Sequence, residues 1–349
     1  MNIRNILKSL RVTALVALGA CANVAVMALD LGENFELHGY GDISRELRNV
    51  DATGQGRNAR ESTFENSWVG IWTATDRVKF WVQVAADESS PVHFDGAFLD
   101  YQSESGLTYR VGRVRVPFGM HSEKREAQAL RPSASLPFLY DVNLNLIDES
   151  LEGGMIRRGF AIGGGQAMVE AYAARAVRDE STRVARGLMV GGRLMMETPV
   201  EGLTLGVSGY QGELERNDGN PQLSKRSWAL SARYQGDRVD LQAEYGRGFI
   251  YTRDVSTWYL QAAVPLAEQW KAVTRIEEMV TDLAQSNDDA YREQRVIVGL
   301  AYAINHYLGL RLEQQFHRGY ASRVVNEALA PGDGRQHWTS TLLSLNYKF

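Results

Sequence analysis

Residues 226–247 read RSWALSARYQGDRVDLQAEYGR, and the order of apolar and polar residues in this stretch decides the fold. Two alternating runs are separated by Gly236-Asp237, residue types that are common in tight turns. The apolar positions of the two runs are Trp228, Leu230, Ala232, Tyr234, Val239, Leu241, Ala243 and Tyr245. A period of two residues places them on one face of a β-hairpin and the polar residues on the other. The stretch is therefore predicted to form two strands with one apolar and one polar face.

The same alternation recurs along the rest of the chain. We expect sixteen strands, near residues 34–48, 62–74, 78–88, 95–104, 107–116, 153–163, 166–178, 187–197, 203–213, 226–236, 237–247, 255–265, 268–283, 292–303, 306–318 and 336–349. An even number of such strands is typical of a bacterial outer-membrane barrel, whose apolar face meets lipid. A soluble periplasmic sandwich, which would turn that face into a core, is the competing interpretation.

The connections between these strands alternate in length. Short ones are expected at 75–77, 105–106, 163–165, 199–202, 236–237 and 305, and longer ones near 49–61, 89–94, 117–152, 179–186, 214–225, 248–254, 284–291 and 319–335. Short periplasmic turns opposite longer outer loops are typical of outer-membrane barrels. The predicted fold is therefore all-β, a 16-stranded antiparallel transmembrane β-barrel with a long third outer loop folded into it.

The N-terminus has the layout of an export signal. Arg4, Lys8 and Arg11 precede an apolar run over 12–28, which ends in Val26-Met27-Ala28. Small or apolar residues at these last positions are typical of a cleavage site. We predict a cleaved signal peptide over 1–28 and a single barrel domain over 29–349. A membrane anchor and lipidation at Cys21, in a Leu-Gly-Ala-Cys sequence, are the alternatives.

Charge and cysteine content exclude several kinds of partner. The chain has 38 Lys plus Arg and 42 Asp plus Glu, and removal of the three basic residues of the leader leaves 35 against 42, a net charge of −7. An acidic balance argues against a nucleic-acid partner. Cys21 is the one cysteine of the sequence, so the mature chain has no disulfide and no cysteine-ligated metal.

The C-terminus fits a barrel that is assembled in the outer membrane. Residues 341–349 read TLLSLNYKF, an alternating strand that ends on Phe349. This ending resembles the signal through which the barrel-assembly machinery recognises its substrates. Outer-membrane lipid and lipopolysaccharide are the other expected partners of the outer surface. Aromatic residues suited to interfacial girdles are Trp68, Trp72, Trp258, Trp270 and Trp338.

The interval 117–152 interrupts the strand pattern. It reads PFGMHSEKREAQALRPSASLPFLYDVNLNLIDESLE and contains three of the eight prolines of the chain. A loop of this length within a compact domain is usually functional. We predict that it folds into the bore and constricts it.

Sixteen strands, a mature length near 320 and a longest loop after the fifth strand resemble the general bacterial outer-membrane porins over the whole mature chain. The segment 112–119, GRVRVPFG, together with Glu123, Arg125, 131–133 and 136–137, resembles more narrowly a group of proteobacterial porin-like proteins with little assigned function. The resemblance implies an inward third loop and a homotrimer. It does not extend to the basic wall cluster of the general porins, nor to the basic ladder of phosphate-selective porins, so selectivity stays open.

Charged residues on the loop and on the polar faces of the strands are the candidate pore-lining residues. The loop supplies Glu123, Lys124, Arg125, Glu126, Arg131, Asp141, Asp148 and Glu149. The wall supplies Arg110, Arg113, Arg115, Arg157, Arg193, Arg233, Arg275 and Arg311. We expect a transverse field between loop carboxylates and wall guanidiniums. Loop-anchoring ion pairs and solvated surface charges are the alternatives.

Arg113 and Arg115 are out of phase with Arg110 on the expected fifth strand. A bulge near Gly112 would turn both inward and leave Val114 and Val116 facing outward. A location between subunits is the other way to avoid arginines in lipid.

These features favour a porin for passive diffusion of small hydrophilic solutes and ions, with a slight preference for cations. A substrate-specific channel, for an anion or an organic acid, is the alternative, and an outer-membrane barrel enzyme is less favoured because no nucleophile and base form a known motif. No catalytic residue, cofactor or metal is expected. The histidines lack ligand spacing, and acidic loop tips such as Asp87-Glu88 are the weak case for calcium.

Overall fold

The computed structural model describes residues 34–50, 57–87, 92–125, 127–141, 146–147, 150–177, 184–185, 187–216, 223–250, 252–288, 291–319 and 337–349. The predicted signal peptide over 1–28 lies outside these ranges. So do residues 126, 142–145, 148 and 149 of the predicted constriction loop, which include the candidate pore-lining residues Glu126, Asp148 and Glu149.

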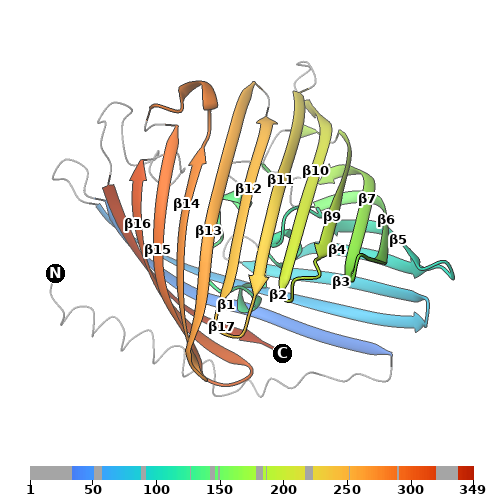
Figure 1. Ribbon diagram of the computed structural model, residues 1–349, viewed down its shortest axis with the longest axis horizontal. Helices are drawn as coiled ribbons and strands as arrows, with labels where there is room; N and C mark the ends of the chain where they lie inside the picture. The colour runs from blue at the N-terminus through green and yellow to red at the C-terminus, as the bar shows by residue number, and fades with distance from the viewer. Residues whose placement is uncertain are drawn as a thin grey trace.

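Sixteen strands form a closed antiparallel barrel, as the sequence predicted (Figure 1). They are β1 (Phe35–Val50), β2 (Arg57–Thr75), β3 (Val78–Asp87), β4 (His93–Gln102), β5 (Leu107–Arg115), β6 (Ser150–Ile162), β7 (Gly165–Val177), β9 (Leu188–Glu197), β10 (Leu203–Arg216), β11 (Leu223–Gln235), β12 (Asp240–Ile250), β13 (Arg253–Ala267), β14 (Trp270–Val280), β15 (Arg292–Ala303), β16 (Leu308–Gly319) and β17 (His337–Lys348). A two-residue strand, β8 (Val184–Ala185), pairs with the end of β10. Every sequence neighbour in the ring is antiparallel, and β17 returns to pair with β1.

The C-terminal strand closes the ring. The backbone of Phe349 exchanges two hydrogen bonds with Gly39 of β1, at 3.0 and 3.2 Å. A Cβ atom on Gly39 would lie 2.0 Å from the Phe349 ring, so this position has to lack a side chain for the ring to lie against β1. The terminal aromatic residue and the glycine opposite it therefore belong to one closing contact.

The hairpin at 226–247 shows which face of the sheet points out of the barrel and which points into it. Ala232 of β11 lies opposite Ala243 of β12, and the flanking apolar side chain of Leu230 is 51% exposed. Ser231 and Glu244 also lie opposite each other and are buried. The apolar face therefore points outward and the polar face inward, which is the arrangement of a barrel in lipid.

The bulge predicted near Gly112 is not present in the pairing of β5. Its register with β4 and with β6 is continuous, and Gly112 instead has a positive φ of 138° in close contact with β4. Val114 lies opposite Leu151, and both are buried inside the barrel. Val116 is fully buried in the same cluster, so the expectation that the two valines face outward was wrong. Arg113 lies opposite the exposed Glu152, on the outer face.

Strand β12 is shifted three residues toward the C-terminus relative to its predicted range, and β13 is longer than predicted at both ends. They pair up to Ile250 and Arg253, so two residues connect them where the sequence suggested a loop over 248–254. Helical structure in the described ranges consists of four single-turn 3₁₀ helices, and none is long and apolar enough to span a membrane. One of them, η4 (Leu283–Gln285), lies in the connection between β14 and β15.

An arginine in the middle of the outward face tests the assignment of the two faces. Leu260, near the centre of β13, is 46% exposed on that face. We expect Leu260→Arg to lower the free energy of unfolding by about 2–4 kcal/mol, because a guanidinium at mid-membrane is poorly solvated. The measurement is urea unfolding in lipid vesicles. Ser256→Arg, nearer the strand end, is the control and should have a smaller effect; equal effects would contradict this orientation.

Candidate functional site

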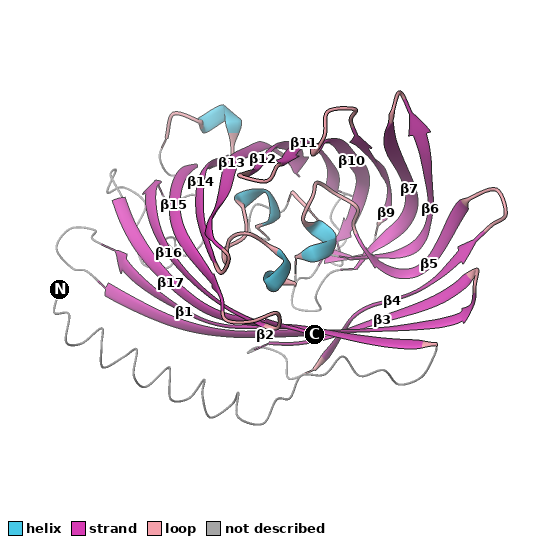
Figure 2. Ribbon diagram, turned by 60° about the horizontal axis from the view of Figure 1, so that its bottom comes forward, coloured by secondary structure: helices cyan, strands magenta, loops and turns pink. Residues whose placement is uncertain are grey.

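The connection between β5 and β6 lies inside the ring of strands, and Figure 2 shows its three short helices there. They are η1 (Ser122–Lys124), η2 (Gln128–Leu130) and η3 (Phe138–Tyr140). We refer to residues 116–149 as the inner loop. Its side chains Phe118 and Leu139 are almost fully buried, in one apolar cluster with inward residues of the wall. The Phe118 ring meets the ring of Tyr210 on β10 edge-on, with centroids 5.7 Å apart.

Carboxylates of the wall accept hydrogen bonds from the backbone of the inner loop. Glu244 on β12 accepts from the amide of Met120 at 3.0 Å and from the hydroxyls of Tyr140 and Tyr259, both at 2.6 Å. Glu277 on β14 accepts from the amide of Phe138 at 2.8 Å. Amide groups that lie in an irregular buried segment need such acceptors, since a buried amide without a partner is costly.

Glu313 on β16 performs the same role for a part of the loop that lies between Met120 and Phe138. It accepts from the amides of Ala134 and Ser135, at 2.5 and 3.2 Å, and from the Ser135 hydroxyl at 2.7 Å. Three wall carboxylates on alternate strands therefore hold three successive parts of the inner loop.

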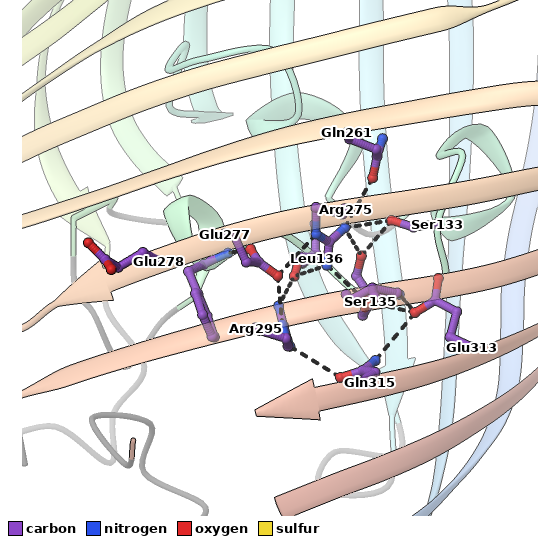
Figure 3. A network of polar contacts seen from close by, with 12 residues as sticks. Ser133, Ser135, Leu136, Gln261, Arg275, Glu277, Glu278, Arg295, Glu313 and Gln315 are labelled. Carbon is purple, nitrogen blue, oxygen red and sulfur yellow. Dashed lines mark hydrogen bonds and ion pairs between the residues drawn. The ribbon is translucent and has the colours of Figure 1, made fainter. Parts of the chain in front are cut away.

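Wall arginines bind the carbonyl groups of the same loop (Figure 3). Arg275 on β14 donates to the carbonyls of Ser135 and Leu136, each at 3.0 Å, and Arg295 on β15 donates to Leu136 at 2.8 Å. Both guanidiniums also bond to Glu277, at 3.0 and 2.6 Å. Arg275 is fully buried, so its charge is balanced by this carboxylate and by the loop carbonyls together.

Two more wall arginines contact the inner loop at other points. Arg311 on β16 donates to the carbonyl of Gln128 at 2.8 Å. Arg193 on β9 donates to Gly119 at 3.1 Å and forms ion pairs with Glu123 of the loop and Glu170 of β7, each at 2.6 Å. The loop is thus held by charged groups on opposite sides of the barrel.

The pKa values of His121 and Glu123 bear on how the inner loop is held. Burial, and to a smaller extent nearby arginines, lower the pKa of His121 to about 4, although its ring forms a 2.9 Å hydrogen bond with Gln242 of β12. Burial acts to raise the pKa of Glu123, but the guanidinium of Arg193 outweighs burial and holds it below the ordinary value. His121 is therefore neutral and Glu123 charged at neutral pH.

A cavity of about 410 Å³ separates the inner loop from the wall formed by β1–β5 and β17. The carboxylates of its wall are Glu46, Glu65, Asp87 and Asp95. The loop side carries Arg125 and Arg131, and Arg115 lines the cavity from the end of β5. The sequence predicted loop carboxylates facing wall guanidiniums; among the described residues of this cavity, the polarity is the reverse.

Several contacts fix the charged groups of this cavity. Arg115 forms an ion pair with Asp95, a residue displaced at the register shift between β3 and β4. Glu65 accepts a 2.9 Å hydrogen bond from Gln128 of the inner loop. These contacts orient carboxylates and guanidiniums across the cavity.

The remaining predicted wall residues form ion pairs away from this cavity. Arg110 bonds to Asp100 at 2.7 Å, Arg233 to Asp240 at 2.6 Å, and Arg157 lies 3.7 Å from Glu170. On the loop, Lys124 lies in η1 and Asp141 directly follows η3. A pore-lining role remains a prediction for every candidate, and for Arg193, Arg275 and Arg311 the structure adds contact with the inner loop. Within the described ranges, no group of His, Asp or Glu is placed to hold a metal ion.

The acidic residues that line the cavity, and those that accept hydrogen bonds from the inner loop, were not among the predicted pore-lining residues. The wall carboxylates of the cavity and the loop acceptors are Glu46, Glu65, Asp87, Asp95, Glu244, Glu277 and Glu313. Period-two counting places Glu244, Glu277 and Glu313 on the polar faces of their strands, which was the available signal. It does not show which of them meet a segment more than one hundred residues away.

Comparison with known proteins was made by family models, by sequence and by structure. No family model matches, and no curated protein matches by sequence. An anion-selective porin from Comamonas acidovorans superposes with a TM-score of 0.63 at 15% identity, covering 90% of this chain and 100% of that porin. The chain has the fold of the general bacterial porins. Salmonella typhi OmpF, in complex with daunomycin, gives a TM-score of 0.59 at 14% identity over 90% of this chain and 98% of OmpF.

A third porin-fold structure is the outer membrane channel DcaP of Acinetobacter baumannii. It gives a TM-score of 0.61 at 10% identity and covers 93% of this chain and 100% of DcaP. At such identities the likeness concerns the barrel, and the side chains in the bore have to be interpreted from this chain alone.

Removal of a wall arginine should release the inner loop of this porin fold. We expect Arg275→Gln to increase the rate of trypsin cleavage after Lys124 and Arg125 by roughly tenfold, because charged hydrogen bonds to two loop carbonyls are lost. Arg233→Gln is the matched control, since its partner is Asp240 of the neighbouring strand. Equal cleavage of the wild type and the Arg275→Gln variant would show that this arginine does not hold the loop.

Acid should weaken the docking of the inner loop through His121. A released loop has an ordinary His pKa near 6.5, whereas the docked ring has a pKa of about 4. As the pH falls, the released loop therefore binds a proton before the docked loop does. The free energy of docking becomes about 2 kcal/mol less favourable between pH 7 and pH 5. Glu123 stays charged over this range because Arg193 lowers its pKa.

The measurement is hydrogen exchange of the amides of residues 118–125 at both pH values, corrected for intrinsic exchange. His121→Gln, whose amide can still reach Gln242, should remove most of the pH dependence. The same acid-induced loss of protection in both proteins would assign the effect to another group.

Proposed function

We propose that the protein is a non-enzymatic outer-membrane porin, a water-filled channel for passive diffusion of small hydrophilic solutes and ions. The observation that carries the proposal is the cavity of about 410 Å³ between the inner loop and the wall, with charges of both signs. The porin fold, the outward apolar face and the export-type N-terminus support a location in the bacterial outer membrane.

The arrangement of charge suits polar solutes. Wall carboxylates and loop guanidiniums face each other across the cavity, so a solute that crosses it experiences a transverse field. Such a field orients dipolar and zwitterionic solutes and disfavours apolar ones, which gain nothing from it. Four wall carboxylates against three arginines favour cations slightly.

A substrate-specific channel for anions or organic acids is the second candidate. Arg115, Arg125 and Arg131 all line the cavity, and guanidinium groups bind carboxylates in a bidentate manner. The anion-selective porin of similar fold shows that this architecture accommodates such selectivity.

We also propose a homotrimer. A solved OmpT of Vibrio cholerae with this fold is described in a trimer form, at 9% identity and a TM-score of 0.58. On this chain, the outer face of β6 and β7 carries the small, exposed residues Gly154, Ala171 and Ala173, which would allow close packing of a neighbour. The assembly machinery would engage the terminal strand that ends at Phe349.

Single-channel recording in a planar bilayer, with reversal potentials under a salt gradient, tests the function. We expect stepwise conductance and a cation-to-anion permeability ratio slightly above one. Glu65→Gln with Asp87→Asn should lower this ratio, and Arg125→Gln with Arg131→Gln should raise it. Asp254→Asn on the outer wall is the control and should leave it unchanged.

A correctly folded barrel without channel activity would contradict the porin proposal. A wild-type ratio well below one, raised by the arginine variants, would favour the anion-specific candidate. Heat-modifiable migration on a gel verifies that each variant is folded before it is recorded.

A further inference from the structure

Two aromatic side chains of the wall lie on the inner face of the barrel. Trp81 on β3 is opposite Phe98 on β4, and their rings are stacked, with centres 5.6 Å apart and planes inclined by 18°. Gln83, two positions after Trp81 and on the same face, donates a 2.9 Å hydrogen bond to the buried Ser67. Phe98 packs against the apolar cluster that holds the inner loop. The two rings therefore face the bore, unlike the aromatic residues that face lipid.

The pair lies between the charged cavity and the end of the barrel that carries the short turns. Ala85 and Asp87 line the cavity from β3, and Trp81 precedes them by four and six residues. At about 3.3 Å per residue, Trp81 is therefore roughly 13–20 Å further along the strand, toward the short turn between β2 and β3. Short turns are expected on the periplasmic side. A solute that leaves the cavity toward the periplasm passes these rings.

A guanidinium extends the stack on the neighbouring strand. The guanidinium carbon of Arg110 on β5 is 3.8 Å from the centre of the Phe98 ring. Two hydrogen bonds to Asp100, at 2.7 and 2.8 Å, orient this guanidinium and balance its charge. Arg110, Phe98 and Trp81 follow one another on β5, β4 and β3, so Trp81 is the last member of the stack. Trp81 and Phe98 are both partly exposed.

We propose that Trp81, supported by Phe98, is a stacking subsite of the bore for solutes that carry a planar aromatic ring and a positive charge. A flat ring gains contact with an indole face that a puckered aliphatic ring of the same size does not. Tryptophan is also the side chain whose ring attracts cations most strongly.

The charges near the passage favour the positive sign. Asp100 neutralises Arg110, so the stack itself presents no net charge to a solute. The cavity that precedes the stack has four carboxylates against three arginines. A cationic solute is therefore attracted to the cavity and then retained at the indole ring, whereas an anion has only the ring contact.

The inference rests on the proposed channel function and specifies which solutes the channel retains longest. The two can fail separately in one experiment. Absence of stepwise conductance would contradict the porin proposal, whereas normal conductance without a preference for planar rings would contradict the subsite alone.

The experiment measures block of the single-channel current in a planar bilayer by solutes added to one side. The concentration dependence of the block gives an apparent dissociation constant for each solute. Benzylammonium and cyclohexylmethylammonium have the same charge and nearly the same size, and only the first has a planar ring. We expect the wild type to bind benzylammonium about fivefold more tightly than cyclohexylmethylammonium. Benzoate should bind more weakly than benzylammonium.

Variants assign the preference to the inner stack. Trp81→Leu should make the two ammonium ions bind equally, and Trp81→Phe should retain a preference for the planar ring. Trp72→Leu is the matched control, because Trp72 is stacked on Phe80 with ring centres 5.3 Å apart and is 50% exposed on the outer face of the same hairpin. Its loss should leave the ratio of the two constants unchanged. The ratio is compared because a change of pore width affects both solutes alike.

Three results would overturn the proposal. They are equal binding of the two ammonium ions by the wild type, an unchanged preference in Trp81→Leu, and tighter binding of benzoate than of benzylammonium. The comparison of solutes on the wild type needs no variant, so it remains decisive if Trp81→Leu does not fold.

Discussion

In the hydrocarbon region of a membrane, each backbone amide and carbonyl has to find its partner within the protein. This constraint accounts for the closed sheet, in which β17 returns to β1 and no strand has an open edge. Closure also gives every strand one face toward lipid and one toward the bore. The glycine at 39, against which the ring of Phe349 lies, shows how closely the closing contact depends on single residues.

The same constraint applies to the inner loop, which has no neighbouring strand to supply partners. Wall side chains replace them: Glu244, Glu277 and Glu313 accept from its amides, while Arg275 and Arg311 donate to its carbonyls. Because these side chains are charged, each is stabilised by an opposite charge or by several loop groups at once. These charged side chains of the wall therefore hold an irregular segment inside the barrel.

Period two was enough to predict the fold, because the alternation of apolar and polar residues recurs in strand after strand. It failed at Val114, where the inner loop makes the inside of the barrel apolar and buries a valine on the inward face. Charge along the sequence likewise did not show that Glu123 would pair with Arg193 beneath the loop, nor that Arg125 and Arg131, predicted as pore-lining, would face wall carboxylates across the cavity. Those positions depend on how the loop folds, and its folding depends on residues from β9 to β16.

The arginines that hold the inner loop and the arginines that line the cavity affect ion selectivity differently. Arg193, Arg275 and Arg311 are engaged with the loop and are not among the residues that line the cavity, so they contribute less to the field that a solute meets there. That field is left mainly to the cavity residues on β1–β5 and on the outer surface of the loop. A change of sign at one or two of these positions would alter ion preference without disturbing the contacts that hold the loop. Porins of one fold can therefore differ in selectivity while the anchoring of the loop and the closure of the barrel stay the same.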